Sequence, residues 1–127
     1  MIVLDASAAV AALLRDGSAR EAVTREQLHV PHLIDAEVAQ ALRRLVAVGS
    51  LPAAAGQRLV TRWSALALVR HPLHGLLPRI WALRENISAY DATYVALAEA
   101  LGCALVTADP RLSRAPGVEC AITVVPR

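Results

Sequence analysis

Residues 88–112 read SAYDATYVALAEALGCALVTADPRL and combine a predicted helix, its end, a buried strand and an acidic turn. Four of its apolar residues recur at the spacing of one helix face: Tyr94, Leu97, Ala98 and Leu101. That spacing predicts an amphipathic α-helix, and Gly102 follows where a left-handed residue commonly ends one. The apolar run over residues 103–106 is typical of a short strand that is covered on both faces. Asp91 therefore opens the helix, and Asp109 lies just beyond the strand.

The same alternation of strand and helix continues through the rest of the chain. Short apolar runs predict further strands over residues 2–4, 28–30, 66–69 and 122–125. Apolar spacing predicts helices over about residues 6–14, 31–48, 50–66 and 75–85, with a short helix or turn within 15–27. Pro31 suits a first helical turn, and Val60 and Leu77 are expected on buried faces. We therefore expect one α/β domain over residues 1–127, an α/β/α sandwich around a mainly parallel sheet of four to five short strands.

Four acidic residues are predicted to meet at one edge of this sheet. Asp5 and Asp109 each follow a strand, and right-handed crossovers bring the carboxyl ends of parallel strands to the same edge. Glu37 and Asp91 lie in the first turns of helices that begin at that edge. Asp35 falls on the opposite flank of its helix from Glu37 and is not expected to share the site. Ligands of such folds bind outside the carboxyl ends, where the strand order reverses.

Each acid also has a structural explanation when it is taken alone. Asp5 could cap the following helix, Asp91 forms a capping-box pattern with Ser88, Asp109 precedes proline in a turn, and Glu37 suits a helix N-terminus. Taken together, however, clustered carboxylates repel one another unless a cation shares the site. The ion favoured by such oxygen ligands is Mg²⁺ or Mn²⁺. This pattern favours metal-dependent phosphoryl chemistry and does not separate a nuclease from a phosphatase.

Composition excludes several other classes. All thirteen basic residues are arginine, and the absence of lysine excludes a P-loop and a phosphorelay receiver. The formal charge of +2 is too small to indicate nucleic-acid binding. No apolar run approaches the roughly 18 residues of a membrane span, and no basic segment precedes the first apolar residues, so a cytoplasmic protein is expected. Cys103 and Cys120 are expected to be small buried hydrophobes, and the four histidines structural or exposed.

Three segments resemble the PIN-domain ribonucleases, most closely the VapC toxins of bacterial VapBC toxin–antitoxin pairs: MIVLDASAAVAALL (1–14), VPHLIDAEVAQALRR (30–44) and AYDATYVALAEALGCALVTADPRL (89–112). The resemblance implies that a metal site is formed by four acids: Asp5, Glu37, Asp91 and Asp109. It places the hydroxyls of Ser7 and Thr107 beside them. It further implies Mg²⁺- or Mn²⁺-dependent endonucleolytic cleavage of tRNA or rRNA by the toxin of a type II pair. The implied partners are a cognate VapB antitoxin and a second copy of the chain, with larger toxin–antitoxin assemblies as a further possibility.

Two other functions are weighed against this one. A haloacid-dehalogenase-like phosphatase also begins with an acid after its first strand, but it needs a second aspartate where this chain has Ser7, and it needs a lysine. A catalytically weak binding module could use the acidic pocket only to attract a basic partner. Arg15, Arg111 and Arg114 are expected near the same edge, where solvated surface charge is favoured over phosphate contact.

Overall fold

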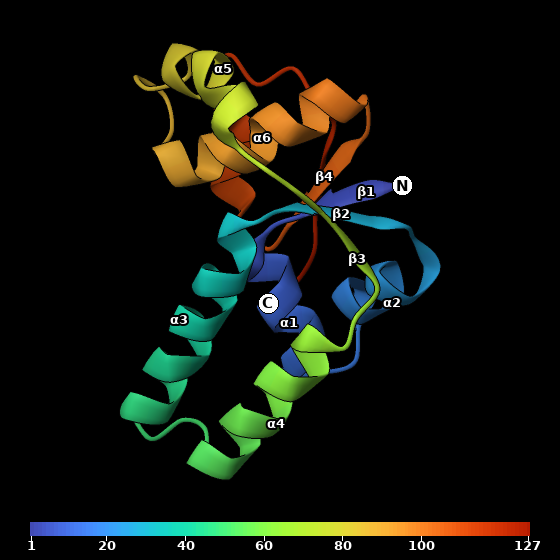
Figure 1. Ribbon diagram of the computed structural model, residues 1–127, viewed down its shortest axis with the longest axis vertical. Coiled ribbons are helices and arrows are strands. Elements are labelled where there is room, and N and C mark those ends of the chain that lie inside the picture. Colours follow the sequence, from blue (N-terminus) through green and yellow to red (C-terminus); the bar gives the residue numbers. More distant parts are fainter.

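A parallel five-stranded sheet in the order β3-β2-β1-β4-β5 forms the centre of the computed structural model, which describes residues 1–127 (Figure 1). The strands are β1 (Ile2–Leu4), β2 (Leu28–Pro31), β3 (Leu68–His71), β4 (Ala104–Thr107) and β5 (Ile122–Val124). The helices are α1 (Ala6–Leu14), α2 (Ser18–Arg25), α3 (Leu33–Ala47), α4 (Ala53–Ser64), α5 (Leu77–Ala82) and α6 (Ala89–Leu101). Two 3₁₀ turns, η1 (His74–Leu76) and η2 (Pro110–Arg114), complete the chain. The predicted α/β/α sandwich is confirmed.

Helices cover both faces of the sheet. Figure 1 shows α5 and α6 on one side and α1 to α4 on the other, with α3 and α4 projecting as a pair. The core of 28 buried apolar residues lies between these layers and the sheet. Cys103 and Cys120, predicted to be buried, are half-buried free thiols that pack against this core.

Helix α6 contains more buried residues than any other helix, and it packs against β1, β2 and β4. Every residue from Ala92 to Ala98 is buried, so the predicted apolar stripe is only part of its contact surface. Ser88 caps its beginning, and Gly102 ends it with a φ of 65°. A residue with a Cβ strains at that φ, which explains a glycine here.

Four local predictions are wrong. Pro31 ends β2 instead of opening a helix, because the ladder to β3 continues through the His32 N–H, which donates to the His71 carbonyl. Val60 is 44% exposed, because α4 packs through the face of Gly56 and Trp63. The predicted helix over 75–85 is a 3₁₀ turn followed by the shorter α5, and its Leu77 is 52% exposed. Strand β3 lies two residues later than predicted.

The strand order reverses between β1 and β4. From β1 the chain builds outward through β2 to β3, and it then returns through α6 to place β4 on the other side of β1. Asp5 directly follows β1, and Asp109 lies two residues beyond β4, so these acids flank the reversal point. Ligands of parallel α/β sheets bind at this place. None of the helices is long and apolar enough to cross a membrane.

Candidate active site

Asp5 combines a capping role with a buried position at the sheet edge. Its side chain is only slightly exposed, and its Oδ1 accepts the backbone N–H of Ala8 at 2.9 Å, which caps α1. Ser7 Oγ donates to the same oxygen at 2.7 Å, and Thr107 Oγ1 donates to Oδ2 at 2.5 Å. Both carboxylate oxygens of Asp5 are thus held in a fixed direction. Asp5 can therefore cap α1 and still belong to the acidic site.

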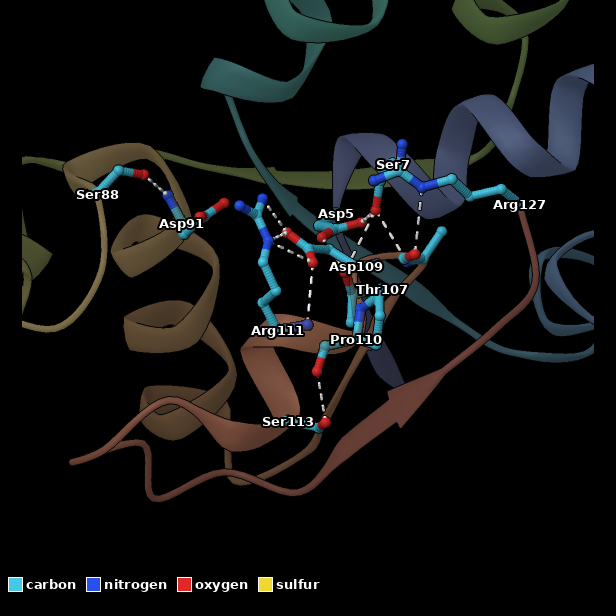
Figure 2. A network of polar contacts seen from close by, with 11 residues as sticks. Asp5, Ser7, Ser88, Asp91, Thr107, Asp109, Pro110, Arg111, Ser113 and Arg127 are labelled. Carbon is cyan, nitrogen blue, oxygen red and sulfur yellow. Dashed lines mark hydrogen bonds and ion pairs between the residues drawn. The ribbon is translucent and has the colours of Figure 1, made fainter.

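The two hydroxyls also join the start of α1 to the turn that follows β4. Ser7 Oγ accepts the Ala108 N–H at 2.8 Å, and Thr107 Oγ1 accepts the Asp109 N–H at 3.0 Å. Figure 2 shows this network running from Asp5 through Ser7 and Thr107 to Asp109. The hydroxyls lie beside the acids as predicted, although their role in function stays a prediction.

Asp91 is held by its backbone, and its carboxylate is not used in the cap. Its N–H donates to Ser88 Oγ at 3.1 Å, which is one half of the predicted capping box. The Asp91 carboxylate accepts no hydrogen bond, and it points toward the Arg111 guanidinium (Figure 2). Ser88 therefore positions the first turn of α6 while leaving both Asp91 oxygens available to a ligand.

Glu37 is held by a residue that sequence reasoning assigned to the core alone. The Tyr94 hydroxyl on α6 donates to Glu37 Oε1 at 2.5 Å, across the space between α6 and α3. Tyr94 is only 2% exposed, and a buried tyrosine hydroxyl needs a polar partner. That requirement was the available signal, but the identity of the partner depends on tertiary structure.

Three of the four acids are disfavoured as anions in their present surroundings. Burial raises the pKa of Asp5, Glu37 and Asp91 above their ordinary values. The acids also raise one another: the charge of Asp5 acts on the pKa of Glu37 and Asp91, and that of Asp109 on Asp5 and Asp91. Such mutual repulsion is relieved by a bound cation. The site is therefore electrostatically suited to a cation.

Asp109 differs because it already has a positively charged partner. The Arg111 guanidinium donates to both Asp109 oxygens, and this contact holds the pKa of the carboxyl below its ordinary value. Arg111 is solvated surface charge as predicted, with a side chain that is 81% exposed, but its ion pair with Asp109 was not predicted. In this arrangement no three His, Cys, Asp or Glu side chains converge as a set that could hold a metal ion. The four carboxylates are nevertheless the hard oxygen donors that Mg²⁺ and Mn²⁺ prefer.

Comparison with known proteins identifies the fold family. Residues 2–118 match the PIN domain family, and ribonuclease VapC9 of Mycobacterium tuberculosis is 61% identical over 127 residues, which is 100% of both chains. This chain belongs to the PIN-domain family, in its VapC group. The crystal structure of VapC20 from Mycobacterium tuberculosis, described as a sarcin–ricin loop cleaving toxin, has a TM-score of 0.69 at 17% identity over 94% of this chain and 97% of that chain. VapBC2 from Rickettsia felis, solved with a promoter DNA fragment, has a TM-score of 0.72 at 16% identity over 98% and 99%.

Asp35 lies outside the acidic site of this PIN domain, as its flank of α3 predicted. It accepts two hydrogen bonds from Arg70, from Nε at 2.7 Å and from Nη2 at 2.9 Å, and one from Trp63 Nε1 at 2.8 Å. The Arg70 guanidinium lowers the pKa of Asp35. Asp35 thus links α3 to α4 and β3 and has a structural role.

An open groove of about 730 Å³ leads to the acidic site of the PIN domain between α1 and α3. Its lining is mainly apolar, with Ser7 and Glu37 among the polar residues. Three arginines also line it: Arg15, Arg44 and Arg127. The last of these was not predicted near the site, and its charge helps to lower the pKa of Asp109. The groove therefore combines an apolar surface with positive charge beside the four acids.

Proposed function

We propose that this PIN domain is a Mg²⁺- or Mn²⁺-dependent endoribonuclease and the toxin of a type II toxin–antitoxin pair. The observation that carries the proposal is the set of four acids at the strand-order reversal, three of them with pKa values raised by burial and by one another's charge. Membership of the VapC group supports RNA as the substrate. The proposed substrates are tRNA and rRNA, in loops where bases can unstack.

The protein side chains prepare the site before an ion binds. Ser7 and Thr107 orient Asp5 by donating to its two oxygens, and Tyr94 orients Glu37. Asp5, Glu37 and Asp91 would hold the ion directly or through water, and Asp109 would join them or hold a second ion. A bound ion supplies positive charge that acidifies water and stabilises the leaving oxygen in phosphodiester hydrolysis.

Cleavage by purified protein tests the enzymatic part of the proposal. The substrates are a tRNA mixture and a sarcin–ricin-loop hairpin, incubated with Mg²⁺, with Mn²⁺ or with a chelator. Asp5→Asn and Asp91→Asn are expected to abolish cleavage. Asp16→Asn is the matched control, because the Asp16 side chain is 95% exposed and pairs only with Arg20. Cleavage at the parent rate by both site variants, or full activity with the chelator, would refute the assignment.

Metal binding is tested separately from activity. An ion that binds only the folded protein stabilises it, so millimolar Mg²⁺ is expected to raise the melting temperature of the parent. The same concentration is expected to have a much smaller effect on Asp91→Asn. An equal shift in both proteins would contradict the role of Asp91.

The groove between α1 and α3 is the proposed binding surface of a VapB-type antitoxin. Its apolar lining and its arginines suit an amphipathic segment that carries acidic residues. We expect a small reading frame adjoining this one to encode the antitoxin, and Val10→Asp on the groove wall to weaken the complex in a pull-down. If Val10→Asp still binds the antitoxin as the parent does, the antitoxin does not bind in this groove.

A homodimer is the proposed free form, with larger assemblies formed with the antitoxin. Val48 and Val60, on the α3–α4 pair, are 74% and 44% exposed, which supports that pair as the contact surface. Light scattering after size-exclusion chromatography is expected to give twice the chain mass of 13.5 kDa. Monomeric protein at micromolar concentration would contradict this part.

A further inference from the structure

Arg111 donates hydrogen bonds to both carboxylate oxygens of Asp109, one of the four acids of the site. Its Nε lies 3.0 Å from Asp109 Oδ1 and 3.2 Å from Oδ2, and its Nη2 lies 2.8 Å from Oδ2. Its own backbone N–H donates to Oδ1 at 3.0 Å. Both Asp109 oxygens are therefore engaged by a single residue two positions along the chain.

The position of this guanidinium matters as much as its partner. Figure 2 shows it between the carboxylates of Asp91 and Asp109. Of the five ion pairs in the structure, it forms the only one that includes any of the four acids. A positive charge of the protein thus lies where a cation shared by Asp91 and Asp109 would have to bind.

Little holds Arg111 in this place apart from the ion pair. Its side chain is 81% exposed, whereas that of Asp109 is 13% exposed. Exposed ion pairs contribute little to stability, since solvent competes for both partners. The arginine can therefore move away without disturbing the core, while Asp109 stays in its turn.

From this arrangement we propose that Arg111 is a displaceable counter-ion of the four-acid site. It pairs with Asp109 while no divalent cation is bound, and it releases Asp109 when one binds. The released guanidinium then stands beside the site, where its fork of N–H groups suits an RNA phosphate. This inference rests on the proposed metal-dependent function.

Removing the Arg111 side chain is expected to strengthen metal binding and to weaken RNA binding. A divalent ion has to displace Arg111 and bind against its charge, so Arg111→Ala is expected to tighten Mn²⁺ binding about three- to tenfold. The same change removes a phosphate contact, so it is expected to raise KM for RNA. A residue with a merely structural role would not strengthen metal binding when it is removed.

The experiment measures Mn²⁺ affinity by calorimetry, and by the electron paramagnetic resonance of free Mn²⁺, on the full chain without RNA. Arg114→Ala is the matched control, because Arg114 belongs to the same 3₁₀ turn and forms no ion pair. We expect tighter binding in Arg111→Ala and a much smaller change in Arg114→Ala. Circular dichroism verifies that each variant is folded.

Two outcomes would overturn the inference, and they are distinguishable. If the parent binds Mn²⁺ and cleaves RNA but Arg111→Ala binds Mn²⁺ no more tightly than Arg114→Ala, only the counter-ion role fails. If the parent neither binds Mn²⁺ nor cleaves RNA, the proposed function fails together with it.

Discussion

Replacing Thr107 by valine tests how the protein holds Asp5. Thr107 is completely buried, and valine matches its shape while lacking the hydroxyl. The change removes the hydrogen bond to Asp5 Oδ2, leaves the Asp109 N–H without its partner, and removes a longer contact of 3.3 Å with Ser7 Oγ.

The expected loss of stability follows from the two shorter contacts, with Asp5 Oδ2 and with the Asp109 N–H. A hydrogen bond to a charged group contributes about 1.5–3 kcal/mol, and a neutral one about 1 kcal/mol. Asp5 keeps its bonds from Ala8 and Ser7, and the added methyl group is apolar, so part of the loss is offset. We expect Thr107→Val to lower the free energy of unfolding by about 2 kcal/mol. It also removes a bond that favours the Asp5 anion, so the pKa of Asp5 is expected to rise further.

Urea unfolding without metal, followed by the fluorescence of buried Trp63, provides the assay. With a slope typical of a domain of this size, the midpoint is expected to fall by about 1 M. The coupling is measured by a double-mutant cycle with Asp5→Asn, in which Thr107→Val should cost about 1 kcal/mol less than in the parent. An equal cost in both backgrounds would show that the hydroxyl does not act through the Asp5 charge, and the reasoning would fail.

Three further predictions concern stability. Burial lowers the pKa of His29, and the charge of His71, whose Nε2 lies 2.8 Å from His29 Nδ1, lowers it further. The unfolded chain therefore binds a proton more readily, and stability should decline as pH falls below about 6.5; a urea midpoint that is constant from pH 7 to 5 would contradict this. Asp35→Asn loses the charged pairing with Arg70 and is expected to lower unfolding free energy by about 1 kcal/mol while leaving Mn²⁺ affinity unchanged; altered Mn²⁺ affinity in calorimetry would place Asp35 in the site after all. Asp91→Asn removes one of the repelling charges and is expected to raise the melting temperature of the metal-free protein; a lower value in differential scanning calorimetry would argue against repulsion.

Local sequence was sufficient to predict the alternation of helices and strands. It was also sufficient to place the four acids just after strands or in the first turns of helices. The spacing of apolar residues distinguishes a helix from a strand, and Gly102 marks the C-terminal end of α6. Because parallel strands share one carboxyl edge, placing Asp5 and Asp109 after strands already placed both at that edge. The flank of Asp35 could likewise be predicted from helix geometry alone.

Tertiary structure decided which side chains meet at that edge. The strand order places β1 beside β4, and only this brings Thr107 against Asp5. Tyr94 on α6 donates to Glu37 on α3, and because the two residues are 57 positions apart, no local pattern contains this pairing. Arg111 lies only two residues from Asp109, yet its contact depends on the turn after β4, and the charge of Asp91 on α6 adds to that of Asp109 in raising the pKa of Arg111. Sequence periodicity reports the surroundings of one element at a time, whereas the electrostatics of this site arise from elements that meet only after the sheet is assembled.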